Sequence, residues 1–143
     1  MAETVHEAAD ALKTLILTVT GVHDPGTTPP TQLTDFPVVL TFPENCTWRV
    51  NTSGVSDGSH TLTAELHWPW STFPASWAEA KSYGETVKNT ILSPTANGLT
   101  LNTTVDVVAE IRGRFGQHPL GYGRLETYGW VFEVDIEIRN TTG

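Results

Sequence analysis

The feature that most constrains this chain is a regular alternation of apolar and polar residues close to its C-terminal end. Between Phe132 and Ile138, every second residue is acidic: Glu133, Asp135 and Glu137. Successive side chains of a β-strand point to opposite faces, so this pattern predicts a strand with one buried and one solvated face. A sheet of such strands needs a cover on one side only, and helices can supply it. The predicted buried face comprises Trp130, Phe132, Val134, Ile136 and Ile138.

Other segments show the same period of two. Residues 99–111 alternate, with Ala109 and Ile111 placed on the predicted buried face, and they are expected to pair with the final strand as a long hairpin. Residues 36–43 and 46–50 predict two shorter strands bounded by prolines. In residues 60–68, the predicted buried face holds Leu62, Ala64, Leu66 and Trp68, and the polar face holds Thr61, Thr63, Glu65 and His67.

Two segments carry apolar residues at helical spacing. The first starts with a capping-box pattern, Thr4 and Glu7, and is expected to end at Gly21. The second starts after Ser76 with the same pattern and is expected to end near residue 92. The predicted buried positions are Val5, Ala8, Ala9, Leu12, Leu15, Ile16 and Val19, then Trp77, Ala80, Gly84, Val87 and Ile91.

The order is therefore helix, two or three strands, helix, two strands. It predicts one α+β domain over residues 1–143, with a largely antiparallel (mixed) sheet and two α-helices packed on one face. The net charge of −8 argues against a protein that grips the outside of duplex DNA. No apolar run is long enough for a membrane span, so we expect no membrane partner.

The compartment can also be anticipated. The single cysteine, Cys46, excludes an internal disulfide, and the acidic start of the chain does not resemble a secretory leader. Both features predict a reducing environment. The alternative is a secreted glycoprotein, in which four Asn-x-Ser/Thr triplets would be acceptor sites. They begin at Asn45, Asn51, Asn102 and Asn140.

Three kinds of site find little support in the motifs. Residues 110–130 are rich in glycine and hold three of the chain's eight basic residues, but they lead into a strand and lack a phosphate-loop pattern. Cys46 has no nearby histidine in the sequence and is predicted to be a small core residue. No two histidines have metal-ligand spacing, and His60 and His67 should face opposite sides of one strand. We expect no catalytic, cofactor-binding or metal-binding residues, and we predict loop or surface positions for His6, His23, His60, His67 and His118.

The acidic row of the last strand allows three interpretations. Neighbouring carboxylates lie roughly 6.5–7 Å apart along a strand, a separation that a two-carboxylate hydrolase could use. Acid–base catalysis, however, needs one carboxyl in an apolar pocket, and this row is expected to be uniformly exposed. A solvated sheet face is the simplest interpretation. The third is an acidic wall, formed by Glu133, Asp135 and Glu137, that repels a polyanion and lets it pass.

Residues 110–130 are expected to form a strand, a protruding contact loop and a returning strand. Arginine together with aromatic residues is typical of protein–protein contacts. Single-stranded nucleic acid is bound by similar loops, but the rest of this chain is acidic. Trp68, Trp70 and Trp77 either close one end of the core or form an apolar patch for a partner. The predicted contact residues of the loop are Arg112, Arg114, Phe115, His118, Tyr122 and Arg124.

The layout resembles one known family. A short helix and a loop precede "TDFPVVLTFPE"; "HTLTAELHW" follows, then a helix after "PASW", and two strands ending "YGWVFEVDIEI". This order is similar to that of the tail terminator (tail-completion, or head–tail joining) proteins of long-tailed bacteriophages. The resemblance covers nearly the whole chain, and it is one of layout rather than of diagnostic residues. The Pro-rich residues 22–35 and the Gly-rich crossing depart from it.

The resemblance implies a non-enzymatic virion protein without cofactors. It implies a homo-oligomeric ring, a hexamer in most of the family, that caps the tail tube and joins it to the head-closure or neck protein. Genomic DNA would pass through the ring without specific binding. The protein would be found in the virion and, during assembly, in the host cytoplasm. Two alternatives stay open: another phage neck or tail-tube adaptor such as a head-closure protein, and a small α+β hydrolase or ligand-binding domain.

Overall fold

The computed structural model describes residues 5–23, 37–50, 56–69, 77–93, 107–122 and 125–139. Within these ranges, two strands rather than three lie between the helices, and the predicted α+β class is confirmed. The elements are α1 (Val5–Leu17), β1 (Val38–Val50), β2 (Ser56–Pro69), α2 (Trp77–Leu92), β3 (Val107–Tyr122) and β4 (Leu125–Arg139).

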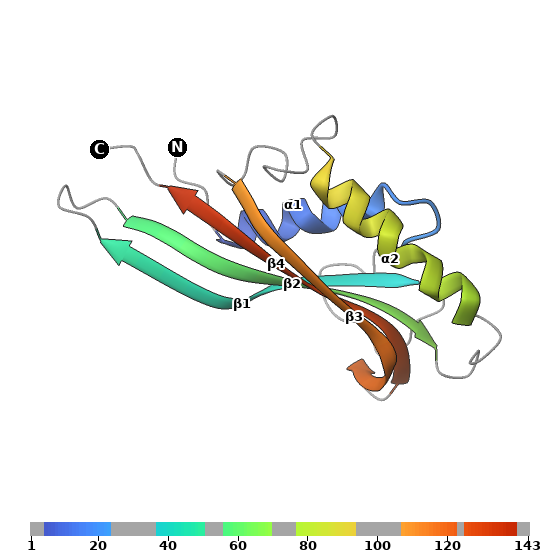
Figure 1. Ribbon diagram of the computed structural model, residues 1–143. Coiled ribbons are helices and arrows are strands. Elements are labelled where there is room, and N and C mark those ends of the chain that lie inside the picture. The colour runs from blue at the N-terminus through green and yellow to red at the C-terminus, as the bar shows by residue number, and fades with distance from the viewer. Residues whose placement is uncertain are drawn as a thin grey trace.

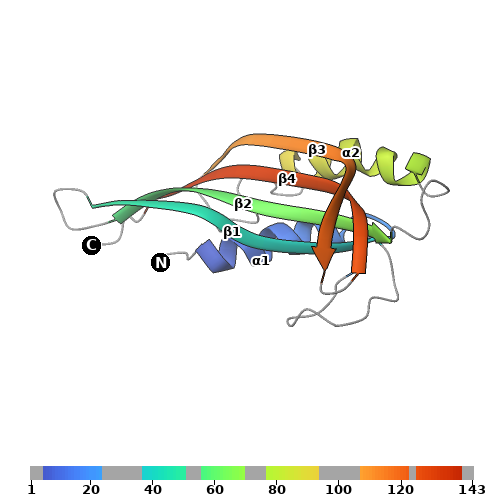
Figure 2. The same ribbon diagram turned by 90° about the horizontal axis from the view of Figure 1, so that it is seen from below.

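The four strands form one antiparallel sheet in the order β1-β2-β4-β3. Two hairpins, β1–β2 and β3–β4, are joined where β2 pairs with β4, and a single bridge from His23 to Val38 adds a short parallel contact beside β1. Both helices lie against the same side of the sheet (Figures 1 and 2). We call this side the covered face, and we call the other side, which carries no helix in the described ranges, the open face. Among the described strands, β1 and β3 form the two edges of the sheet.

The core lies between the covered face and the helices, as the two periodicities predict. On β2 and β4 the alternate residues meet across the ladder: Leu62 opposes Val134, and His60 opposes Ile136. Burial of these side chains removes apolar surface from water, which is the main source of stability in such a domain. The largest fully buried side chains include Leu12, Ile16, Leu62, Leu66, Ile91, Tyr128, Val134 and Ile136.

Helix α1 ends earlier than predicted, at Leu17 rather than at Gly21. A tight turn follows, in which the Thr18 hydroxyl donates to the Leu15 carbonyl at 2.6 Å. Gly21 then adopts φ of 93°, a left-handed conformation that glycine accepts without a Cβ clash. The helix therefore ends before the glycine, and the backbone N–H groups of Thr18 and Val19 satisfy the carbonyls of Leu15 and Ile16. The capping residues predicted for both helices, Thr4 and Ser76, lie outside the described residues.

Helix α2 ends at Leu92, as predicted, and it approaches the sheet closely at Gly84. A Cβ on Gly84 would overlap the six-membered ring of Trp130. The Trp130 indole nitrogen donates to the Ala80 carbonyl at 2.9 Å, so the ring is held in place from one turn earlier on the helix. The missing side chain at Gly84 therefore creates the slot that this tryptophan fills.

Strand β1 corrects one prediction, because the two short strands expected around Pro43 are one strand. The register with β2 shifts between Pro43 and Asn45, which leaves Glu44 as a bulge, and Glu44 accepts a hydrogen bond from the Thr63 hydroxyl. Proline and bulges are tolerated on edge strands, whose outer side needs no partner. The bulge keeps Phe42 and Asn45, opposite Thr63 and Thr61, on the open face.

Strand β3 corrects a second prediction, which concerns the residues on its buried face. Its register with β4 shifts between Val108 and Glu110, so Ala109 forms a bulge. Val108 is buried and Ala109 is exposed, and the predicted placement of Ala109 on the buried face beside Ile111 is therefore wrong. Such a bulge depends on pairing with a distant strand and leaves no mark in the local alternation. The earlier part of the predicted strand, residues 99–106, lies outside the described residues.

The predicted β3–β4 hairpin is confirmed, but its protruding loop is not. Strand pairing continues through a second irregularity, between Gly116 and Leu120, as far as Tyr122 opposite Leu125. The distal part of the hairpin bends away from the helices, toward the open face (Figures 1 and 2). The Gly-rich stretch is thus mainly bent strand, because glycine tolerates bulges and close backbone approach.

Candidate functional site

Arg112 is the centre of a polar network on the open face. It lies on β3 opposite Glu133, and its guanidinium binds both oxygens of Asp135 on β4, with Nη1–Oδ2 at 2.6 Å and Nη2–Oδ1 at 3.0 Å. Nη2 also lies 3.2 Å from Oε2 of Glu133. Asp135 accepts a further hydrogen bond from the Thr61 hydroxyl of β2 at 2.8 Å. The network therefore links three neighbouring strands.

The charges in this network reinforce one another. The Arg112 guanidinium lowers the pKa of Asp135, with a smaller contribution from Thr61, while partial desolvation acts in the opposite direction. The same hydrogen bonds raise the pKa of Arg112 further above its ordinary value. Asp135 is therefore ionised at neutral pH and already paired. It is a poor candidate for a proton donor.

The acidic row is less exposed than predicted. The side chains of Glu133 and Asp135 retain 35% and 31% of their exposure, and Glu137 is also half-buried. The prediction of a uniformly exposed row is thus wrong. The physical reason is the basic residue on the adjacent strand, since Arg112 reaches across to β4 and neutralises part of the row. Its remaining carboxylates keep this part of the open face acidic.

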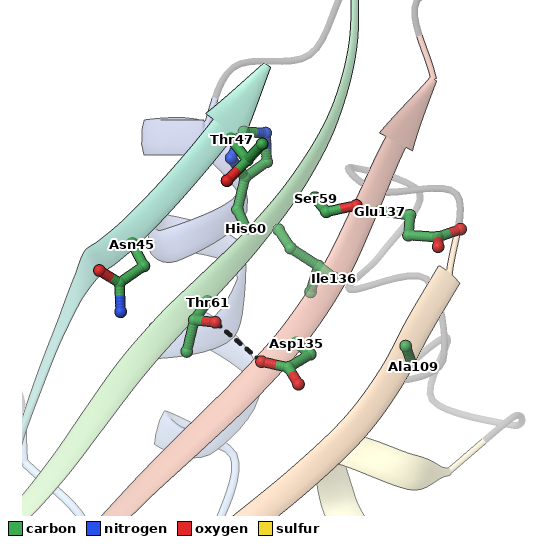
Figure 3. A pocket seen from close by; sticks show the side chains of 9 residues that line it. All are labelled: Asn45, Thr47, Ser59, His60, Thr61, Ala109, Asp135, Ile136 and Glu137. Carbon is green, nitrogen blue, oxygen red and sulfur yellow. Dashed lines mark hydrogen bonds between the residues drawn. The ribbon is translucent and has the colours of Figure 1, made fainter. Parts of the chain in front are cut away.

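A shallow depression of about 310 Å³ lies beside this network on the open face. Figure 3 shows Thr61 reaching Asp135 along its wall, between side chains from neighbouring strands. Oxygen atoms of short polar side chains and of two carboxylates surround it. Among the described residues, no group of three His, Cys, Asp or Glu side chains could hold a metal ion. The lining residues are Asn45, Thr47, Ser59, His60, Thr61, Ala109, Asp135, Ile136 and Glu137.

Two histidines are buried where surface positions were predicted. His60 faces the covered side and is 4% exposed, whereas His67 faces the open side and is fully buried. Their opposite orientation confirms the prediction from their odd spacing. His67 Nε2 lies 3.1 Å from the Glu65 carboxylate. Burial lowers the pKa of His60, because desolvation disfavours the imidazolium ion. His6 and His23 are exposed, as predicted.

His60 is packed beneath Trp48. The two rings lie 5.3 Å apart at 60°, and a Cβ on Gly58 would overlap the imidazole, so this glycine makes room for it. Within the described part of the chain, His60 Nδ1 is a buried side-chain nitrogen without a hydrogen-bond partner. Cys46, directly opposite His60 on β1, is a free, half-buried thiol that packs against the core, in line with its predicted role.

Trp68 and Trp77 close the core between β4 and the start of α2. Trp68 is 3% exposed and stacks on the fully buried Tyr128. Trp77 stacks on Phe115 with ring centroids 4.6 Å apart. Of the two predicted roles, closure of the core therefore accounts for both of these tryptophans. Trp70 lies outside the described residues.

The predicted contact residues are not gathered on one loop. Arg112 and Arg114 are exposed on β3, but Arg112 is already engaged with carboxylates of its own chain. Phe115 is half-buried, packs against the core and stacks on Trp77. His118 and Tyr122 belong to the distal part of β3, and their side chains are not described; Arg124 lies outside the described residues. The use of these residues as an interface stays a prediction.

Sequence reasoning missed the aromatic side chain that is most exposed among the described residues. Trp48 is 62% exposed on the edge strand β1, and Phe42 on the same strand is 39% exposed. A large apolar side chain on a free strand edge is a common element of an interaction surface. The signal was the short stretch "CTWRV", in which the tryptophan stands between polar neighbours. Only the strand order places it at an edge.

Comparisons with known proteins leave the family open. No protein-family model matches the chain, and a search of curated proteins gives no match.

In the described ranges, no helix is both long and apolar enough to cross a membrane.

Proposed function

We propose that this chain is a structural subunit that assembles into a ring at the end of a bacteriophage tail. The ring would cap the tail tube, join it to the head or neck, and let DNA pass through its hole. Two helices on one side of a four-stranded sheet, in the order helix, hairpin, helix, hairpin, are compatible with the layout on which the family resemblance rests.

The observation that carries the proposal is the presence of two unlike sheet edges. A closed ring of identical subunits requires head-to-tail contacts, in which two different patches of each subunit fit each other. In the described residues, β1 and β3 are the two edges, and they differ in sequence and charge. β1 beyond its bulge carries an exposed tryptophan, and β3 carries Glu110, Arg112 and Arg114.

The open face suits the inner wall of such a ring. Glu133, Asp135 and Glu137 would face the lumen, and the net charge of −8 on each subunit would keep the DNA from adhering. Arg112 would hold these carboxylates in place while neutralising part of their charge. The helices would then lie on the outside, where they shield the apolar face of the sheet.

The test is the assembly state of the purified protein. We expect light scattering to give a mass of several subunits, and negative-stain electron microscopy to show rings with a central hole. If the protein alone is a monomer, tail-tube protein should induce the rings. A strict monomer under both conditions would contradict the proposal.

The alternatives differ in their partners. Another neck adaptor, such as a head-closure protein, would also form rings but would not bind the tail tube, which co-sedimentation with tail-tube protein can decide. A small hydrolase or ligand-binding domain would use the depression beside Asp135. The lowered pKa of Asp135 disfavours acid catalysis there. A thermal-shift screen with metals and small ligands would detect binding if this alternative holds.

A further inference from the structure

The subunit contact can be specified further from the two sheet edges, and this inference rests on the proposed ring. Past the Glu44 bulge, residues 45–50 of β1 pair with β2 on their inner side. On β3, residues 110–114 pair with β4 on their inner side. Within the described residues neither segment has a strand on its outer side. Unpaired backbone groups on such an edge can form a ladder with another chain.

The direction of that ladder follows from the topology. All pairings between neighbouring strands are antiparallel, and the sheet has four strands, so β1 and β3 run in opposite directions. A second copy placed beside the first in the same orientation therefore brings its β1 antiparallel to β3. This arrangement joins unlike edges and keeps the open face of every copy on one side. It is the head-to-tail contact that a ring requires.

Charge favours one register for the ladder between β1 of one copy and β3 of the next. With Arg49 opposite Glu110, an exposed cation meets a carboxylate whose side chain is 61% exposed. A shift of two residues would instead place Arg49 opposite Arg112, and like charges directly opposed destabilise a sheet. In the favoured register, Thr47 lies opposite Arg112 on the same open face.

The same register also places apolar residues of the two strands opposite one another on the covered face. Trp48, which is 62% exposed, lies opposite Ile111, a half-buried residue packed against the core. Cys46 lies opposite Gly113, where an added Cβ would come within 3.2 Å of the Phe132 ring. The exposed tryptophan would thus cover an apolar strip at the edge of the neighbouring core. Tryptophan is among the side chains that are enriched at the energetic centre of such contacts.

We propose that β1 of one copy pairs antiparallel with β3 of the next, with Trp48 against Ile111 and Arg49 against Glu110. The occupant of each edge is a second copy of this chain. The contact continues the four-stranded sheet from subunit to subunit, and it leaves the Arg112–Asp135 network intact on the open face.

The native thiol allows a direct test of the register. Cys46 is the chain's single cysteine, so Gly113→Cys adds the one partner that the proposed ladder places opposite it. Directly opposed residues are close enough for a cross-strand disulfide, with copper phenanthroline as the oxidant. We expect a series of covalent multimers on a non-reducing gel, lost when Cys46→Ser is added. The matched control is Arg114→Cys, one residue along, whose side chain points to the other face.

The outcomes of the cross-linking experiment distinguish a wrong register from a wrong assembly. Rings in the microscope without covalent multimers would overturn this register while the ring stands. A covalent dimer of the unmodified chain, through Cys46 of both copies, would indicate symmetric β1–β1 pairing and would also overturn it. A protein that never assembles, even with tail-tube protein, would overturn the ring and this contact together.

A charge exchange tests the same contact without a new thiol, in case Gly113→Cys disturbs Phe132. Arg49→Glu and Glu110→Arg should each raise the concentration needed for assembly by about tenfold or more, because each places like charges opposite one another. The double variant should restore assembly toward the native value. Lys81→Glu, on the exposed side of α2, is the control and should have little effect. Failure of the double variant to recover assembly, with native circular dichroism, would contradict the pairing.

Truncation of the tryptophan completes the test. Trp48→Ala should raise the concentration for half-assembly by about 30-fold or more if it is the centre of the contact. Phe42→Ala, on the same strand but on the open face before the bulge, should have a much smaller effect. Equal effects of the two truncations would contradict the central role of Trp48.

Discussion

The two faces of the sheet are built from the same four strands but are held together by different forces. On the covered face, side chains such as Leu62 and Val134 are fully buried against the helices. On the open face, Arg112 joins Asp135 and Glu133 through charged hydrogen bonds that remain partly in water. Burial of apolar surface contributes far more stability than exposed ion pairs do. The covered face should therefore determine whether the chain folds, and the open face how its surface is charged.

The sharpest test of this contrast is a truncation in the core. Leu12→Ala removes a fully buried side chain of α1 and should lower the free energy of unfolding by about 2–5 kcal/mol, since it leaves a cavity. Leu92→Ala makes the same chemical change at a position that is 39% exposed, and it should cost much less. Urea unfolding followed by circular dichroism measures both. Similar losses for the two variants would mean that α1 is not packed on the sheet as described.

A substitution that adds atoms should also destabilise the covered face. Gly84→Ala would ordinarily favour a helix, but here the new Cβ overlaps the Trp130 ring, and we expect a loss of about 1–3 kcal/mol. Asn89→Ala, at an exposed position of α2, should instead be neutral or slightly stabilising. Thermal unfolding of the two variants compares them, and a rise in Tm for Gly84→Ala would contradict the close approach of helix and sheet.

The open face should respond more weakly and in a pH-dependent way. The pKa of Asp135 is lowered in the folded chain, so its contribution to stability is fully present above the unfolded carboxyl pKa of about 3.9 and is lost as the pH falls through the folded value. Asp135→Asn should reduce stability at pH 7 by less than either core variant. The difference from the native chain should vanish in acid. Glu85→Gln, at a carboxylate that is 81% exposed on α2, is the comparison and should show little change at either pH.

The smallest expected effect concerns His60 beneath Trp48. Its folded pKa is lowered, so the unfolded chain binds a proton more readily, and stability falls as the pH drops below the unfolded value of about 6.5. The loss ends once the pH is below the folded pKa. His60→Gln should flatten this part of the stability profile, while His6→Gln, on the exposed side of α1, should leave it unchanged. An identical pH slope for native chain and His60→Gln would contradict the assignment.

The edge strands contain the features that the local sequence pattern did not predict. The alternation in residues 60–68 correctly predicted which side chains of β2 face the helices, because the pattern depends only on neighbours along the strand. The same reasoning misplaced Ala109, since the bulge in β3 arises from its pairing with β4. It also split β1 at Pro43, because the tolerance for proline depends on β1 being an edge strand.

In the candidate site, too, local patterns identify the residues, whereas strand pairing determines which of them meet. The sequence shows both the acidic row of β4 and Arg112, but its local patterns predict a wall for the first and a separate loop for the second. The register of β3 with β4 brings them together at hydrogen-bonding distance. The burial of His60 and His67 depends on what packs over each face of β2, which no spacing along the chain reveals.

By itself, the sequence determined the class of fold, the two helices, the buried face of each central strand and the acidic character of the surface. These properties follow from the period and composition of short segments, which burial of apolar surface converts into helices and one-sided strands. Only the tertiary structure decided the strand order, the two bulges, the pairing of Arg112 with Asp135 and the position of Trp48 on an outer strand of the described sheet. Those features depend on which distant segments pair and in what register, and hydrogen bonding between strands settles that only when the chain has folded.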